Sequence, residues 1–301
     1  MQLHDEGRST GLNVESDLLH HGEKTDPVPV ASDIDTREGR TRSSLVSRVF
    51  RRSATASVLA LAAVVAIWWI AALLNHDQFI VPSPPQVYHR FITLVSTPGQ
   101  LELAKNILAS LVRVLVGWGA GSAMGIALGV AMATKPWVRG AFEPLIEMIR
   151  PMPALALIPL LIIWFGLGEL PKYVIIWFTT FPVVTISTVS AIQGVERTWI
   201  QAAQTLGASR FYIVTHVVVP GALPGILTGI RLASGIAWGT LVAAEIIGST
   251  QGLGWMILQA EQFLDTSAVF VGIIVIGALA LLMDRLLRLA EHYLIPWQGM
   301  R

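Results

Sequence analysis

Long apolar stretches separated by short polar ones fill most of the chain. A stretch of about 20 apolar residues is long enough to cross a membrane as an α-helix. Six stretches meet or approach that length, and we predict a transmembrane helix in each: residues 54–74, 107–133, 154–167, 173–192, 223–247 and 268–289. The third is the shortest. The pattern therefore predicts an all-α, polytopic membrane protein with about six transmembrane helices.

Residues 1–50 have a different pattern: they are polar, mixed in charge and poor in aromatic side chains. Such a segment cannot bury enough apolar surface to offset its chain entropy. We therefore expect a disordered tail over residues 1–50 and a membrane domain over residues 51–301. The first apolar stretch begins too late and is too long for a cleavable signal peptide, so we expect it to remain as an anchor.

Basic residues near the span ends predict the orientation, because cytoplasmic loops carry an excess of Lys and Arg. With a cytoplasmic N-terminus, ten of them face the cytoplasm: Arg48, Arg51, Arg52, Lys135, Arg139, Arg150, Arg197, Arg210, Arg285 and Arg288. Only Arg90, Lys105 and Lys172 then lie outside. We expect both termini in the cytoplasm and the connection 75–106 outside, where the spacing of Val87, Phe91 and Leu94 predicts a short interfacial helix.

Glycines recur every four residues in two of the predicted spans: Gly117, Gly121, Gly125 and Gly129 in the second, and Gly225 and Gly229 in the fifth. This spacing places small residues on one helix face and lets a neighbouring backbone approach closely. The pattern favours a tightly packed helix bundle. The alternative is that some of these glycines line a moving interface between two subunits.

Composition excludes several classes of protein. Only 14% of the 301 residues are charged, whereas soluble domains have about 25%. The absence of cysteine excludes disulfides, thiolate metal sites and a cysteine nucleophile. The histidines are scattered, so no metal site is expected, and the net charge of +1 gives no reason to expect a nucleic-acid partner. No phosphate-binding Gly-x-x-x-x-Gly-Lys-Ser/Thr loop is present, so we expect neither an ATPase nor any other enzyme, and no cofactor in this chain.

The cytoplasmic connection 194–220 is longer than a simple link between two spans requires. Its residues predict a helix from Arg197 to Leu206, a break at Gly207 in the left-handed conformation, and a second helix capped by Ser209. Pro220 should limit that second helix and start the next span.

This connection has the features of a docking surface for another protein. Ala202 and Ala203 are small enough to let a partner approach the backbone. Apolar anchors and rim charges complete the surface: Leu206, Phe211, Tyr212, Arg197 and Arg210. The alternative is an amphipathic helix lying on the lipid surface, but the central glycine and alanines make a poor membrane anchor.

The spacing of this connection resembles a loop of the binding-protein-dependent ABC importer permeases: Glu-Ala-Ala, three residues, Gly, nine residues, Ile-x-Leu-Pro. Here Gln201-Ala202-Ala203 is followed after three residues by Gly207 and after nine more by Val217-Val218-Val219-Pro220. Gln201 stands where the family has an acid, and valines replace Ile and Leu. The resemblance extends over residues 101–297.

Other segments resemble the taurine, sulfonate and nitrate branch of that family. They are residues 144–153, 163–169, 220–224, 240–245 and 252–254, and the ending Pro296-Trp297-Gln298-Gly299 is most similar to taurine members. The resemblance implies the type I importer permease fold in a bacterial inner membrane. It implies a substrate such as taurine or another sulfonate, with nitrate, bicarbonate or a pyrimidine precursor as alternatives.

The resemblance also implies partners: two copies of an ATPase subunit that binds ATP and Mg²⁺, a periplasmic substrate-binding protein, and a second copy of the permease within the lipid membrane. Residues 194–220 would be the coupling loop that docks the ATPase. A secondary transporter needs no such loop and usually shows internal repeats, and no clear repeat is visible. A purely structural membrane scaffold would leave the loop spacing unexplained.

Polar residues and prolines inside the spans are candidates for the translocation path or its gate. Charges at membrane depth cost about 2.5 to 3.5 kcal/mol each, and proline frees backbone carbonyls that lipid cannot satisfy. Glu245 is a candidate for an outer gate or polar network, or else a carboxylate snorkelling to water. Arg231 faces either an anionic solute or a structural partner, which is an intramembrane ion pair or a lipid phosphate on the inner side, and the structural role is favoured. Arg113 is a further charge near the outer end of its span. Pro159, Thr180 and Thr185 are candidates for the path wall.

Overall fold

The computed structural model describes residues 59–74, 80–96 and 102–296, so the tail predicted over residues 1–50 lies outside the described residues. The chain divides into two compact units, Met1–Val65 and Ala66–Arg301. The helix Leu59–Leu74 begins in the first unit. Apart from the length of this helix, everything that follows concerns the second unit.

The described residues of this unit form helices and connections, as predicted for an all-α protein. Four helices are long: α3 (Glu102–Thr134), α6 (Leu170–Gln193), α9 (Val219–Gly248) and α11 (Thr266–Leu294). The shorter α-helices are α2 (Pro84–Ser96), α4 (Pro136–Ile149), α5 (Ile158–Phe165), α7 (Arg197–Thr205), α8 (Arg210–Ile213) and α10 (Leu253–Gln262). A 3₁₀ turn, η1 (Ala154–Leu157), precedes α5, and a π turn, η2 (Val214–Val218), precedes α9.

Four described helices are long and apolar enough to cross a membrane: Leu103–Thr134, Leu170–Gln193, Arg210–Gly248 and Thr266–Leu294. They confirm the second, fourth, fifth and sixth predicted spans. The helix Leu59–Leu74 is shorter than the first predicted span, whose residues 54–58 lie outside the described residues. The short helix predicted around Val87, Phe91 and Leu94 is present as α2.

The third predicted span, residues 154–167, is present as helical structure over residues 154–165, but this stretch is long and apolar enough for a membrane span only together with the helix before it. The chain forms α4, then a break at residues 150–153, then η1 and α5, and the two helical parts are bent by 88°. Pro151 and Pro153 lie at the break. Proline lacks a backbone N–H and disfavours helical geometry in the residue before it, so two prolines in three residues end the first helix.

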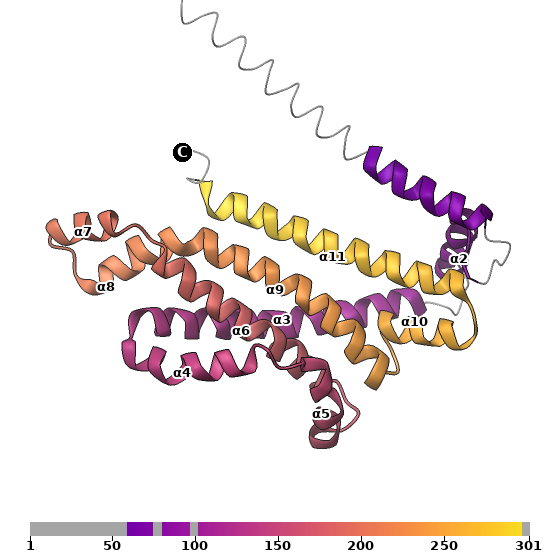
Figure 1. Cartoon of the computed structure of the whole chain (residues 1–301), viewed down its shortest axis with the longest axis horizontal. Helices are drawn as coiled ribbons and strands as arrows, with labels where there is room; N and C mark the ends of the chain where they lie inside the picture. The colour runs from indigo at the N-terminus through magenta and orange to yellow at the C-terminus, as the bar shows by residue number, and fades with distance from the viewer. Residues whose placement is uncertain (1–58, 75–79, 97–101, 297–301) are drawn as a thin grey trace, which may run out of the picture. The chain divides into compact units, whose positions relative to one another are not determined.

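The centre of the unit is built on α6, which packs against both α3 and α9 (Figure 1). A Cβ added to Gly117 would lie 2.7 Å from the Cβ of Ile176, and one added to Gly129 would lie 2.6 Å from that of Thr188. A Cβ on Gly225 of α9 would lie 2.6 Å from that of Ala191 on the other side of α6. The four-residue glycine spacing therefore provides close helix packing, as predicted.

The two ends of this three-helix centre differ (Figure 1). At one end, α7 and α8 connect α6 to α9, and at the other end lie α5 and α10. The candidate residues of the connection between α6 and α9 lie at the first end, and Glu245 and Pro159 lie at the second, whereas Thr180, Thr185 and Arg231 lie between the two ends.

Candidate functional site

The connection between α6 and α9 folds into the predicted helix, break and helix. Gly207 has φ +79°, in the left-handed region where glycine is favoured. The N–H of Ala208 donates to the carbonyl of Ala203, and that of Gly207 donates to the carbonyl of Gln204, which closes the end of α7. Ser209 then caps α8, because its hydroxyl accepts a hydrogen bond of 3.3 Å from the N–H of Tyr212.

Pro220 lies in the first turn of α9, as expected for the start of the next span, but the expectation that it ends the helix before it is wrong. The chain from Arg210 to Gly248 is one continuous helix of 39 residues. The π turn η2 lies directly before Pro220, and the N–H of Val219 donates to the carbonyl of Val214, five residues back. This wider turn and the position of Pro220 in the first turn of α9 let the helix continue past a residue that has no N–H to donate.

The tip of the connection presents large apolar side chains to the outside. Leu206 is 87% exposed and Phe211 is 78% exposed, and Arg210 lies beside Phe211. Gln201 and Ala202 on α7 are also exposed, whereas Ala203 is half-buried against the core. A cluster of exposed apolar side chains with charge at its edge has the composition of a protein-contact surface.

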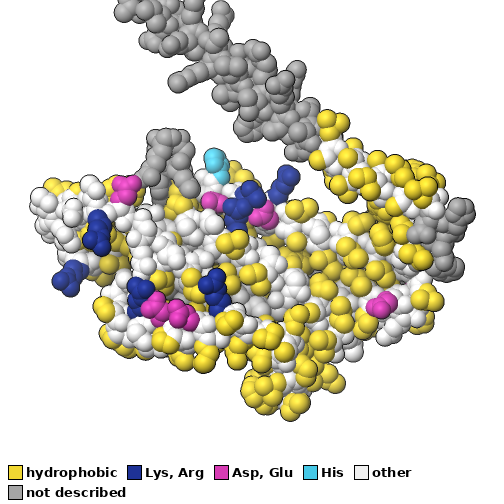
Figure 2. All heavy atoms as spheres, viewed as in Figure 1, with side chains coloured by type: hydrophobic (Ala, Val, Ile, Leu, Met, Phe, Trp, Pro, Cys, Tyr) yellow, Lys and Arg dark blue, Asp and Glu magenta, His cyan; other side chains and the backbone are white. Residues whose placement is uncertain are grey.

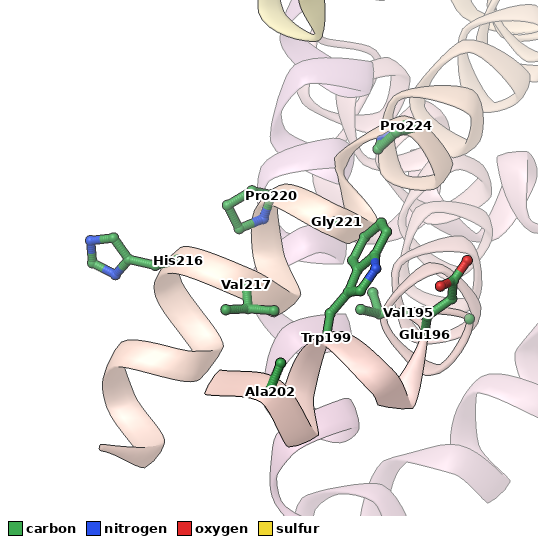
Figure 3. A pocket seen from close by; sticks show the side chains of 10 residues that line it. Val195, Glu196, Trp199, Ala202, His216, Val217, Pro220, Gly221 and Pro224 are labelled. Carbon is green, nitrogen blue, oxygen red and sulfur yellow. The ribbon is translucent and has the colours of Figure 1, made fainter. Parts of the chain in front are cut away.

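A groove of about 760 Å³ lies behind this tip, between α7 and the start of α9 (Figure 3). Trp199 forms one wall and packs near Gly221. His216 lies at the opposite side of the groove, and its ring stacks on that of Tyr212 at 4.1 Å. The groove separates one side of the connection from the start of α9, and the other side contacts the rest of the unit. Residues 197–213 therefore project from the unit, and we refer to them as the knob.

Glu245 lies at the opposite end of α9 from the knob, and its side chain is fully buried. It accepts hydrogen bonds from Nη1 of Arg113 at 2.7 Å, from the hydroxyl of Ser110 at 2.7 Å and from the N–H of Gly254 at 2.8 Å. A snorkelling carboxylate would reach water, so the burial of Glu245 contradicts that alternative. The polar-network alternative agrees with the contacts.

The same network satisfies the first backbone N–H groups of α10. The N–H of Gly252 donates to Oδ1 of Asn106, and that of Leu253 donates to the hydroxyl of Ser110, both at 2.8 Å. With Gly254 bound to Glu245, three N–H groups at the start of α10 are held by side chains of α3 and α9. The carboxylate of Glu245 also lies at the positive end of the α10 dipole.

Arg113 connects this network to the start of α6. Its Nε and Nη2 bind the two carboxylate oxygens of Glu169 at 2.5 and 2.7 Å, and Nζ of Lys172 binds Glu169 at 3.0 Å. These contacts lower the pKa of Glu169 from 4.5 to about 2, with the hydrogen bond from Arg113 as the main cause. The sequence analysis did not predict the ion pairs of Glu169 with Arg113 and Lys172. The three-residue spacing of Glu169 and Lys172 at a helix start was a signal for the pair with Lys172.

Comparison with known proteins places this geometry in a family. Residues 121–294 match the model of the binding-protein-dependent transport system inner membrane component. The chain belongs to this family of ABC importer permeases. A taurine transport system permease protein of Escherichia coli, TauC, is 41% identical over 82% of this chain and 91% of its own length.

Other relatives of this permease extend across the predicted branch. A putative aliphatic sulfonates transport permease protein of Bacillus subtilis is 34% identical over 79% of this chain and 86% of its own length. A nitrate import permease protein of Synechocystis is 27% identical over 85% of this chain and 95% of its own length. The chain therefore groups with taurine, sulfonate and nitrate permeases, and a membrane component of a transport system is the non-enzymatic class that the sequence predicts.

Solved structures confirm the fold class of the permease. An inward-facing MetNI methionine ABC transporter chain superimposes with a TM-score of 0.53 at 20% identity, covering 64% of this chain and 98% of that one. A chain of an amino acid ABC transporter superimposes with a TM-score of 0.51 at 18% identity, over 67% and 98%.

Arg231 of the permease is surrounded by carboxylates. Its Nε lies 3.2 Å from Asp284 and its Nη1 lies 3.1 Å from Glu291, both on α11, and Asp284 also pairs with Arg288 at 2.8 Å. These pairs agree with the favoured alternative, an intramembrane partner, because the guanidinium is occupied by protein carboxylates.

The remaining path candidates lie in two different environments. Thr180 and Thr185 are fully buried where α6 faces the glycines of α3, and their hydroxyls donate to the carbonyls of Ile176 and Phe181. Pro159 lies in the first turn of α5 and is exposed. We therefore retain Pro159, and not the two threonines, in the path proposed below.

Proposed function

We propose that this chain is the permease subunit of an ATP-driven importer for taurine or another small sulfonate. The observation that carries the proposal is the exposed knob at residues 197–213, which combines the Gly207 break with apolar side chains at Leu206 and Phe211. A permease that worked without a partner ATPase would have no use for apolar side chains held out on a rigid cytoplasmic tip.

The knob transmits force in the proposed cycle. ATP binding closes a pair of ATPase subunits, each knob moves with the subunit on which it is docked, and the spans open outward toward a loaded substrate-binding protein. Hydrolysis then resets the inward-facing state. Because α8 and η2 continue into α9, a movement of the knob passes directly into a span.

A second copy of the chain completes the path in this proposal. Helix α5 and the residues directly after it present an apolar surface that includes Ile163, Trp164 and Leu167, which are all more than half exposed. Figure 2 shows the hydrophobic side chains gathered on this part of the unit. A two-fold axis beside α5 would cover this surface with the same surface of the second copy, and Pro159 would lie beside the shared path.

The substrate proposal is supported by the relatives. Permeases named for taurine and for aliphatic sulfonates are 34% to 41% identical to this chain, and the one named for nitrate is 27% identical. Taurine is a zwitterion, and the other named solutes are anions, so a small solute with an acidic oxygen-rich group is common to all of them.

Reconstitution tests this function. The chain, its ATPase and its substrate-binding protein are placed in proteoliposomes, and uptake of labelled taurine, methanesulfonate and nitrate is measured with ATP and with a non-hydrolysable analogue. We expect taurine uptake only with ATP and the binding protein. Uptake that runs at the same rate without any ATPase would show a secondary transporter instead.

A further inference from the structure

The guanidinium of Arg113 has two differently occupied edges. On one side, Nη1 is fixed by the buried carboxylate of Glu245 at 2.7 Å and by the carbonyl of Gln251 at 2.6 Å. On the other side, Nε and Nη2 form a fork around Glu169. The side chain of Glu245 is fully buried, whereas that of Glu169 is 49% exposed. The Nη1 edge of the guanidinium is therefore anchored inside the protein, and the edge with Nε and Nη2 faces a carboxylate that water can reach.

Lys172 adds a second buried cation to the exposed edge. Its side chain is only 6% exposed, and among the described residues Glu169 is the carboxylate with which it forms an ion pair. Arg113 and Lys172 carry two positive charges, and Glu245 and Glu169 balance them. Without the carboxylate of Glu169, only Glu245 would balance the two cations. One positive charge would then be uncompensated, which is destabilising for buried groups.

Glu169 contributes its backbone carbonyl, and not its side chain, to the start of α6. It lies on the short connection between α5 and α6, where its carbonyl starts α6 but its carboxylate does not cap that helix. Gly166 and Gly168 precede it, and a Cβ added to either would meet nothing within 4 Å. The carboxylate is thus held by the two cations and by little else.

We propose that Arg113 and Lys172 form a binding site for the acidic group of the transported solute, and that Glu169 occupies this site as an internal substitute until the solute displaces it. The identity of the solute rests on the proposed function, whereas the binding site rests on the contacts above. A guanidinium fork beside an ammonium suits a sulfonate, because two oxygens bind the fork and the third binds the lysine.

Exchange, and not simple addition, follows from the occupied donors. Nε and Nη2 of Arg113 and Nζ of Lys172 all bind the carboxylate of Glu169. A sulfonate can therefore bind these donors only where the carboxylate of Glu169 leaves them. The exchange keeps the local charge at zero, and the released carboxylate can accept the ammonium group of a zwitterion such as taurine.

The test is anion rescue of a variant that lacks the internal carboxylate. Glu169→Gln is prepared as the full chain in detergent, and its thermal midpoint Tm is measured against sodium methanesulfonate concentration. Glu143→Gln is the matched control, because Glu143 is held by the same type of fork from Arg139, but the side chain of Arg139 is 42% exposed whereas that of Arg113 is 4% exposed. We expect Glu169→Gln to lose several degrees of Tm and to regain most of them with millimolar methanesulfonate, and the control to be unchanged by the salt.

A second pair of measurements keeps the inference open to refutation if Glu169→Gln is unstable. Adding Lys172→Gln to Glu169→Gln should remove most of the rescue. In the wild-type chain, taurine should raise Tm more than methanesulfonate does, and Glu169→Gln should lose that preference. Equal rescue in the Glu143→Gln control, or no rescue at all, overturns the site. These readouts need no ATPase, so a failure of ATP-driven uptake would refute the proposed function and leave the site standing.

Discussion

The knob and the charge network lie at opposite ends of α9 and are built in opposite ways. The knob is local: Gly207 and Ser209 determine its shape within a few residues, and its apolar side chains are exposed. The network is assembled from distant parts of the chain, since Arg113 and Glu245 are 132 residues apart, and its central groups are buried. The comparison indicates that the knob is suited to meeting a partner, whereas the network fixes α3, α9, α10 and the start of α6 relative to one another.

The largest effect is expected at the knob. Gly207→Val should abolish ATP-driven transport, because a β-branched side chain is strongly disfavoured at φ +79° and the break between α7 and α8 would change. Uptake in proteoliposomes and co-purification with the ATPase measure the effect. Gly207→Asn is the control and should keep much of the activity, since Asn tolerates the left-handed region. Normal uptake and normal ATPase affinity in Gly207→Val would refute the local description of the knob.

The network should respond to loss of its central carboxylate. Glu245→Gln leaves Arg113 with a buried charge that is only partly compensated, and breaking a buried pair in this way costs about 3 to 5 kcal/mol. We expect a lower Tm and reduced uptake, with co-purification of the ATPase retained because the knob is at the other end of the unit. Full transport together with full ATPase stimulation by the binding protein would exclude a gate role for Glu245.

The glycine contacts between the two ends should be sensitive to a single methyl group. Gly125→Ala places a Cβ 2.9 Å from the Cβ of Val184 and from the carbonyl oxygen of Phe181, so overpacking of about 1 to 3 kcal/mol is expected. Gly119→Ala on the same helix is the control, because its added Cβ meets nothing within 4 Å. Thermal unfolding in detergent measures both. Equal effects of the two substitutions would show that α3 and α6 are not in close contact.

The smallest expected effect is a pH dependence of the stability of the fold, caused by protonation of Glu169. Its pKa is lowered from 4.5 to about 2, so its ion pairs stabilise the folded chain fully above pH 4.5, and this stabilisation is lost as the pH falls from 4.5 toward 2. The half-exposed position of the carboxylate keeps the effect modest. The difference in Tm between the wild-type chain and Glu169→Gln should therefore shrink over that range. A constant difference would show that the ion pair does not stabilise the fold.

The predictable parts of this molecule are those encoded within one or two turns of chain. The knob followed from Gly207, Ser209 and their neighbours, and the close packing of α3 on α6 followed from the four-residue glycine spacing. Most spans followed from apolar length alone. In each case the physical cause, a left-handed residue, a missing Cβ or the thickness of the bilayer, acts locally on the sequence.

The unpredicted parts depend on tertiary contacts. Arg113, Arg231 and Glu245 stood out as charges in apolar segments, but nothing in their own surroundings along the chain identified Glu245, Asp284 or Glu169 as partners. Asn106 and Ser110 gave no signal at all, because they matter only where the start of α10 meets α3. The continuity of the helix past Pro220 depends on a π turn that no residue pattern in the sequence predicts.

The helical chain from Arg210 to Gly248 is continuous, but it changes direction between α8 and α9 (Figure 1). At 1.5 Å per residue, the 30 residues of α9 extend about 45 Å, about one and a half times the thickness of the hydrocarbon core of a bilayer. The carboxylate of Glu245 therefore lies near the far end of a lever whose near end is the base of the knob. A tilt imposed at Phe211 passes through the π turn before Pro220 and reaches the charge network as a displacement of its anchor.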